Sequence, residues 1–195
     1  METRRPVWHA EPLTLNQVLQ LFAVAAIVCN VATLGLVVAA VRRRGGPGRG
    51  RVSTGRGTAA VGVRTVVGMA ALLAIAATLG SLYLSEIAHL EPCRWCWFQR
   101  IAMYPLALVL AVGWARQDRG VHLYGLPMCV AGAAMSTWHY LLQHFPDLEG
   151  ATTCSITSPC AVRYAWEFGF VSIPYMAGSV FVLVGALLNL ARRRS

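Results

Sequence analysis

Long apolar runs constrain this chain more than any other feature. Five stretches, each close to the roughly 20 residues that a bilayer core demands, run from about 17 to 41, 65 to 85, 96 to 115, 121 to 143 and 171 to 191. The chain is 56% hydrophobic and only 13% charged, which is more apolar surface than one soluble core of 195 residues would use. We therefore expect an all-α integral membrane protein with several transmembrane helices.

The segments between the runs suggest how the chain is divided. Residues 1–41 are expected to form an N-terminal tail and a transmembrane helix, because the first run is too long for the apolar core of a signal peptide. Residues 42–64 are rich in glycine and arginine and predict a flexible linker that buries no core. Residues 65–195 contain the other four runs.

The charged residues predict the orientation in the membrane. All 17 basic residues are arginines, against eight acidic residues. This balance often indicates nucleic-acid binding, but these arginines lie between apolar runs, where they orient a membrane protein, so we expect no nucleic-acid partner. Twelve of them fall in the linker, in the turn at 116–119 and at the C-terminus. The positive-inside rule places these three segments in the cytoplasm and the other connections outside.

The six cysteines include two pairs on the side predicted to face outward, where disulfides persist. Cys93 and Cys96 form a Cys-x-x-Cys motif at the start of a helix, face the same side and can close a readily reduced disulfide. The helix N-terminus also favours their thiolates. Cys154 and Cys160 would either stabilise the long loop or exchange with the first pair, which would carry electrons toward the membrane. Two further cysteines lie mid-run and are expected to act as small apolar side chains: Cys29 and Cys129.

Arg100 lies four residues after Cys96 and therefore on the same helix face, with Gln99 beside it. A guanidinium one turn inside a membrane helix is costly unless it snorkels or has a polar partner. A quinone oxygen that becomes anionic on reduction would be such a partner, as would the Cys96 thiolate. A snorkelling arginine that only fixes the depth of the helix is the structural alternative.

Several motifs together resemble one family. The pattern Pro-Cys-x-x-Cys-x-x-Gln-Arg at 92–100, the segment Trp-His-Tyr-Leu-Leu-Gln at 138–143 and the cysteines of the long loop are similar to the DsbB/BdbC family of bacterial disulfide-formation proteins, which are quinone-linked thiol oxidoreductases. The resemblance covers about 65 to 190. It implies a four-helix transmembrane bundle in the bacterial cytoplasmic membrane, with an additional N-terminal helix in this chain, and a bound ubiquinone or menaquinone.

The resemblance also implies an electron route. Cys154 would be attacked by the reduced thiol of a DsbA-like, thioredoxin-fold partner, and Cys160 would exchange with Cys93. Cys96 would then pass electrons to the quinone, with Gln99 and Arg100 beside it. His139 would either contact the quinone or hydrogen-bond within the bundle. No metal is expected at these residues.

Two other classes of protein fit parts of the pattern. A vitamin K epoxide reductase-like quinone reductase would also use two cysteine pairs, but that family resembles the reverse order, with Cys-x-x-Cys last. A structural zinc protein would use all four outward cysteines as ligands, although the five-residue gap between Cys154 and Cys160 is poor zinc-ligand spacing. That close spacing is similar to BdbC-like members of the family and leaves little room for the longer loop of DsbB-like members.

Overall fold

The computed structural model describes residues 14–45, 56–151 and 160–193. Five long helices make up most of this part of the chain: α1 (Leu15–Gly45), α2 (Arg56–Leu82), α3 (Arg94–Ala115), α4 (His122–His144) and α5 (Ile173–Arg192). A π-helical turn, η1 (Tyr83–Ile87), extends α2, and a 3-10 turn, η2 (Pro146–Ala151), follows α4. The described residues form no β-strand, and one isolated bridge joins Glu167 to Val171.

Four of these helices are long and apolar enough to cross a membrane, over Leu15–Arg42, Gly62–Ile87, Arg94–Ala115 and Ile173–Arg192. The remaining helix, α4, is packed against α3 and α5. Its 23 residues rise about 35 Å, which exceeds the roughly 30 Å of a bilayer core. The predicted all-α membrane fold with an added N-terminal helix is confirmed.

The helices extend into the predicted linker from both sides. α1 continues to Gly45, and α2 begins at Arg56 instead of Thr65. The alanines and valines of segment 56–64 can continue the helix that follows, so the arginine and glycine content of this segment was a poor guide to its secondary structure. The rest of the predicted linker, 46–55, lies outside the described residues.

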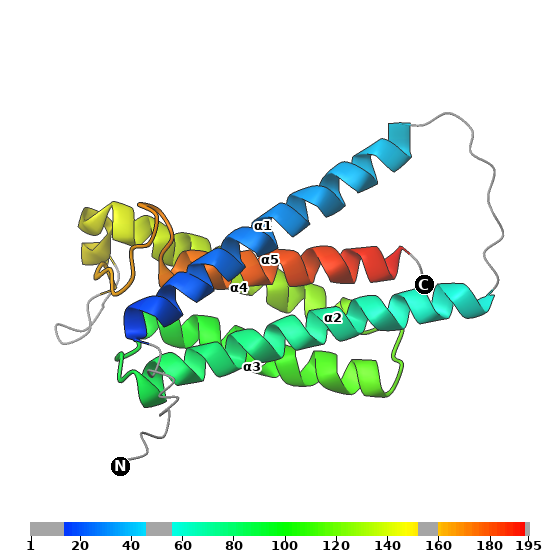
Figure 1. Ribbon diagram of the computed structural model, residues 1–195, viewed down its shortest axis with the longest axis horizontal. Helices are drawn as coiled ribbons and strands as arrows, with labels where there is room; N and C mark the ends of the chain where they lie inside the picture. Colours follow the sequence, from blue (N-terminus) through cyan, green and yellow to red (C-terminus); the bar gives the residue numbers. More distant parts are fainter. Residues whose placement is uncertain (1–13, 46–55, 152–159, 194–195) are drawn as a thin grey trace, which may run out of the picture.

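Successive helices run in opposite directions along one long axis (Figure 1). α2 packs against α3 and α5, and α4 packs against α3 and α5, so these four helices form the bundle. Its centre is made by fully buried side chains of α3 and α5, namely Leu106, Leu110, Phe181, Val184 and Leu188. α1 lies along α5 on the outside of the bundle and diverges from α2 (Figure 1).

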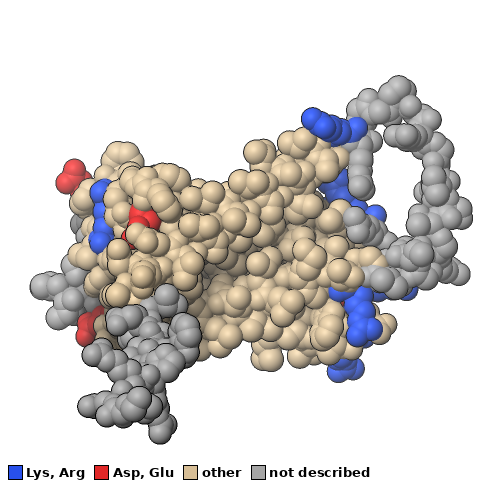
Figure 2. All heavy atoms as spheres, viewed as in Figure 1, with Lys and Arg blue, Asp and Glu red and all other residues tan. Residues whose placement is uncertain are grey.

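The two ends of the molecule differ in charge (Figure 2). Arginine side chains gather where α1 ends, where α2 begins, at the α3–α4 turn and at the end of α5: Arg42, Arg64, Arg116, Arg119, Arg192 and Arg193. The end that holds the α2–α3 connection carries both signs of charge (Figure 2). Its acidic residues are Glu86, Glu91, Asp147 and Glu167, and its arginines include Arg94 and Arg163. The asymmetry on which the predicted orientation depends therefore exists in the folded molecule.

Candidate active site

Three segments that are distant in the sequence meet at the less basic end of the bundle. They are the start of α3, the last turns of α4 and the loop that leads into α5 (Figure 1). Cys93 and Cys160 are buried there against Leu142 of α4, with exposed fractions of 3% and 0%. The fold therefore brings one cysteine of each predicted pair into a single buried cluster.

The Cys-x-x-Cys motif opens α3. Pro92 disfavours a helical conformation at the residue before it, and Cys93 is the extended N-cap residue, with φ −67° and ψ 173°. Cys96 lies in the first turn, and its Sγ is 3.3 Å from the Sγ of Cys93 as a hydrogen bond between two free thiols. The spacing thus places both sulfurs on one side of the helix start, close enough for a small movement to join them.

His139 links this motif to the loop. Its Nε2 lies 3.5 Å from Cys93 Sγ and 3.2 Å from the carbonyl oxygen of Cys160. Its Nδ1 lies 3.2 Å from the Nε2 amide nitrogen of Gln99. An amide nitrogen can only donate, so Nδ1 accepts and the imidazole proton is on Nε2. That N–H can donate to the Cys160 carbonyl or to the Cys93 sulfur.

These contacts favour a thiolate at Cys93. Its pKa is lowered to about 4, chiefly by the hydrogen bond from the Cys96 thiol and also by the hydrogen bond from His139, while burial opposes the shift. The pKa of an unperturbed cysteine is about 8.5. Cys93 therefore carries a negative charge through the neutral range and is activated for thiol–disulfide exchange.

The second predicted pair is only partly described. Cys160 is disulfide-bonded, whereas Cys93 and Cys96 are free thiols. The predicted partner of Cys160, Cys154, lies outside the described residues.

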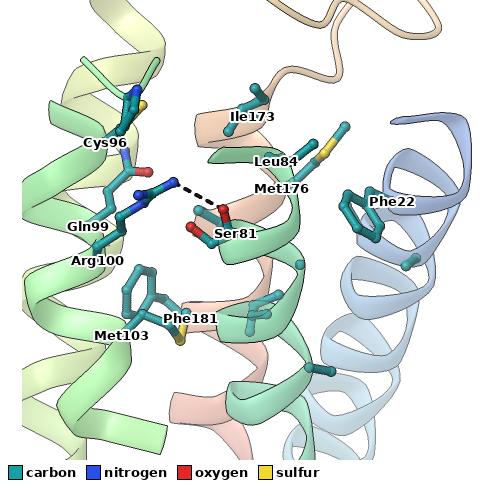
Figure 3. A pocket seen from close by; sticks show the side chains of 18 of the residues that line it. Phe22, Ser81, Leu84, Cys96, Gln99, Arg100, Met103, Ile173, Met176 and Phe181 are labelled. Carbon is teal, nitrogen blue, oxygen red and sulfur yellow. Dashed lines mark hydrogen bonds between the residues drawn. The ribbon is translucent and has the colours of Figure 1, made fainter. Parts of the chain in front are cut away.

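A cavity of about 330 Å³ lies beside the motif between the helices, and Cys96, Gln99 and Arg100 reach into it from α3 (Figure 3). Arg100 donates through Nη2 to the Ser81 carbonyl oxygen at 3.0 Å, and its guanidinium stands 5.2 Å from the centre of the Trp97 ring. A guanidinium has five N–H donors, so Arg100 can hold Ser81 and also donate to a ligand oxygen. Apart from these groups the lining is mostly apolar.

The comparisons with known proteins agree on one family. Residues 63–191 match the family described as Disulfide bond formation protein DsbB. The chain is 44% identical over 113 residues to Disulfide bond formation protein C of Bacillus subtilis (strain 168), which covers 58% of this chain and 82% of that protein.

Other relatives give the same result. A Probable disulfide formation protein C of Halalkalibacterium halodurans is 45% identical over the same shares of the two chains. A Probable disulfide formation protein of Coxiella burnetii (strain RSA 493) is 40% identical over 62% of this chain and 82% of its own length. No solved structure matches the chain.

The chain belongs to the DsbB family. It is therefore a multi-pass membrane oxidoreductase of disulfide bond formation. The match begins at residue 63, so α1 and residues 46–55 lie outside it.

Two features of this DsbB-family site were left open or given no part in a cavity by the sequence analysis. His139 hydrogen-bonds within the bundle and does not line the cavity, because α4 lies behind the cavity wall and its imidazole points toward the cysteines. Conversely, α1 lines the cavity through four side chains to which the sequence analysis gave no role: Phe22, Ala25, Ala26 and Cys29. A stripe of small residues on one face of α1 was the only sequence indication of this.

Ligand atoms of Cys93, Cys96 and His139 lie within 4.8 Å of one another and could hold a metal ion. The four-cysteine zinc site considered from the sequence would need the sulfur of Cys160, which is occupied in a disulfide. The donor set in this part of the DsbB-family chain is therefore two thiols and one imidazole.

Proposed function

We propose that this DsbB-family protein reoxidises a DsbA-like, thioredoxin-fold protein outside the cytoplasmic membrane and passes the electrons to a membrane quinone. The observation that carries the proposal is the arrangement of the two sulfurs of the Cys-x-x-Cys motif. Cys93 is buried against Cys160, and Cys96 lines the cavity. Cys93 thus lies beside Cys160, and Cys96 lies between that cluster and the mostly apolar cavity.

The first half of the cycle transfers a disulfide outward. A thiolate of the reduced partner attacks Cys154 in the Cys154–Cys160 disulfide and expels the Cys160 thiolate. That thiolate attacks Cys93 in the Cys93–Cys96 disulfide and expels the Cys96 thiolate. The second thiol of the partner then attacks the mixed disulfide, so the partner leaves oxidised and Cys154 is released as a thiolate.

The second half restores both pairs. Cys154 attacks Cys160, which re-forms their disulfide and releases the Cys93 thiolate. Cys93 and Cys96 now hold the two electrons, an arrangement that matches the free thiols at 93 and 96 and the bonded Cys160 of the described structure. Hydrogen bonds from Cys96 and His139 stabilise the negative charge on Cys93 at this stage. When this pair is oxidised again, the cycle is complete.

The cavity fits a quinone. It is of the size of small-molecule sites, and it combines apolar walls with Gln99 and Arg100, which would donate hydrogen bonds to a carbonyl oxygen. A bound ubiquinone or menaquinone would accept the two electrons of the dithiol and two protons. Arg100 would favour the negative charge that develops on the ring, and Gln99 would hold His139 in the tautomer that donates to Cys93.

The test is turnover with purified protein. Reduced thioredoxin-fold partner and quinone should yield one quinol for each disulfide formed, with partner thiols and quinone absorbance measured together. Cys96→Ser should abolish turnover, because its oxygen cannot form the disulfide, whereas Cys129→Ser, buried outside the cavity, should keep it. Turnover that persists in Cys96→Ser would contradict the proposed role of Cys96.

A structural zinc protein is the second candidate, favoured only by the cluster of Cys93, Cys96 and His139. It predicts stoichiometric zinc in the purified protein and loss of folding after chelation. The oxidoreductase predicts that chelation leaves quinone-dependent disulfide formation unchanged. Metal analysis and turnover on the same sample separate the two candidates.

A further inference from the structure

α1 lies outside the region that matches the DsbB family and yet forms part of the wall of the cavity. Phe22, Ala25, Ala26 and Cys29 line it, and their spacing of three, four and seven residues places them on one face of the helix. α3 reaches the cavity from the other side with Gln99 and Arg100, so the polar groups and α1 stand on opposite sides (Figure 3).

α1 is fixed to α5 and not to α2. Asn30 donates through Nδ2 to Tyr175 Oη at 2.9 Å and to Ser179 Oγ at 3.1 Å, which are polar contacts of the kind that join membrane helices. In the described chain, no Cα atom of α1 lies within 8 Å of a Cα atom of α2. The Phe22 ring bridges this gap and reaches to 3.2 Å from where a Cβ on Gly80 would lie. Residues of both helices line the cavity, so the space between α1 and α2 is part of it, and the Phe22 ring reaches across that space.

The side chains of this wall are small and apolar. Ala25, Ala26 and Cys29 leave room where larger residues would close the space between the helices. The face of α1 away from the cavity carries larger side chains that are exposed toward the surroundings, such as Val31 with an exposed fraction of 65%. The small residues thus occur where the cavity needs volume.

We propose that α1 forms the subsite for the apolar tail of the quinone, an inference that rests on the quinone-linked function proposed above. A lipid quinone has a polar ring and a long apolar tail. The ring is held by Arg100 and Gln99, and the tail extends between α2 and α5 to the wall made by Phe22, Ala25 and Cys29. The added helix α1 therefore contributes to the affinity for the tail, and α3 contributes to the affinity for the ring.

The test measures binding instead of activity. Two ring types are used, a benzoquinone and a naphthoquinone, each with and without a decyl tail. Each quinone is titrated into the purified protein, and its affinity is measured by calorimetry. Ala25→Phe fills the cavity from α1, and Val31→Phe adds the same side chain to the opposite face of the helix, outside the cavity lining. We expect Ala25→Phe to weaken binding of the decyl quinone at least about fivefold and to leave the unsubstituted ring unchanged, which also shows that the site is folded. Val31→Phe should change neither.

Each other outcome counts against a defined statement. The tail subsite is overturned if the decyl quinone binds Ala25→Phe as tightly as it binds the wild-type protein. It is also overturned if Ala25→Phe weakens binding of the decyl quinone and of the unsubstituted ring equally. If the wild-type protein binds the decyl-substituted and the unsubstituted quinone with the same affinity, the tail subsite is overturned and the proposed function is not. Wild-type protein that binds neither quinone overturns both. Phe22→Ala, which only removes the bridging ring, should also weaken the decyl quinone selectively, and its failure to do so counts against the subsite in the same way.

Discussion

At the residue scale, the reactivity of the site depends on which sulfur carries the negative charge. When Cys93 is ionised, it can accept hydrogen bonds from the Cys96 thiol and from His139, and it is the sulfur buried beside Cys160. Cys96 instead borders the cavity. The two cysteines of one motif therefore have different surroundings, which suits them to different exchange partners.

The lowered pKa of Cys93 can be measured by alkylation of the reduced protein. A thiolate reacts with the alkylating reagent and a thiol does not. The rate of alkylation at Cys93 should therefore stay high through the neutral range and fall only as the pH drops toward the lowered pKa of about 4. Cys96→Ala removes the largest cause of the shift, so the midpoint should move upward. The readout is iodoacetamide labelling of Cys93 by mass spectrometry across pH, with Cys129→Ser as control. A midpoint near 8.5 in the unsubstituted protein would refute a stabilised thiolate.

Gln99 should act on the exchange step through His139. Gln99→Leu removes the donor to Nδ1 and no longer fixes the proton on Nε2. Because a hydrogen bond contributes about 1 kcal/mol, exchange between the two cysteine pairs should slow several-fold. In a His139→Phe background the same substitution should have no further effect, as stopped-flow kinetics of a single turnover can show. An effect on the quinone KM alone would instead assign Gln99 only to the cavity.

Arg100 should affect quinone binding more than thiol exchange. Its replacement by Met keeps an apolar chain in the cavity and removes the charge. Hydrogen bonds to charged groups contribute about 1.5–3 kcal/mol, so the quinone KM should rise roughly tenfold or more. Arg94→Met, one and a half turns earlier and outside the cavity lining, is the matched control. An unchanged KM in Arg100→Met would return this residue to the snorkelling role considered from the sequence.

At the element scale, spacing within a helix was predictable and contact between helices was not. Cys93, Cys96, Gln99 and Arg100 follow one another within two turns, so helix geometry alone predicts their common side. The contact of His139 with Cys93 and the Cys160 carbonyl joins α3, α4 and a loop, and no local pattern encodes it. The start of α2 was missed because the arginines and glycines of 56–64 were weighed more heavily than its alanines and valines.

Glycines let α4 pack closely on α5, and the closest approach is at Gly132. A Cβ at Gly132 would overlap the ring of Phe181, which is fully buried. Gly132→Ala should therefore destabilise the bundle by about 1–3 kcal/mol, the usual cost of overpacking. At Gly35 of α1 a Cβ would meet nothing within 4 Å, so Gly35→Ala should be neutral or slightly stabilising. Thermal unfolding in detergent compares the two, and equal midpoints would contradict tight packing at Gly132.

At the scale of the whole molecule, charge and redox chemistry are separated along the long axis. The cysteine cluster lies at the end marked by acidic residues, and the arginines of the helix ends lie at the other (Figure 2). Anionic lipids and the positive-inside rule favour the arginine end in the cytoplasm. The cysteines would then face an oxidising compartment, in which disulfides persist. Orientation and chemistry therefore support each other.

This orientation can be tested with two introduced cysteines at exposed positions. Asp147 follows α4 at the cysteine end, and Gln117 lies in the α3–α4 turn at the arginine end. In intact cells or spheroplasts, a membrane-impermeant maleimide should label Asp147→Cys at once and Gln117→Cys only after lysis. Each variant is compared with the unsubstituted chain, because the native cysteines contribute their own labelling. Early labelling of Gln117→Cys would place the arginine end outside and the redox cluster in the cytoplasm, where the reducing poise would keep its disulfides from persisting.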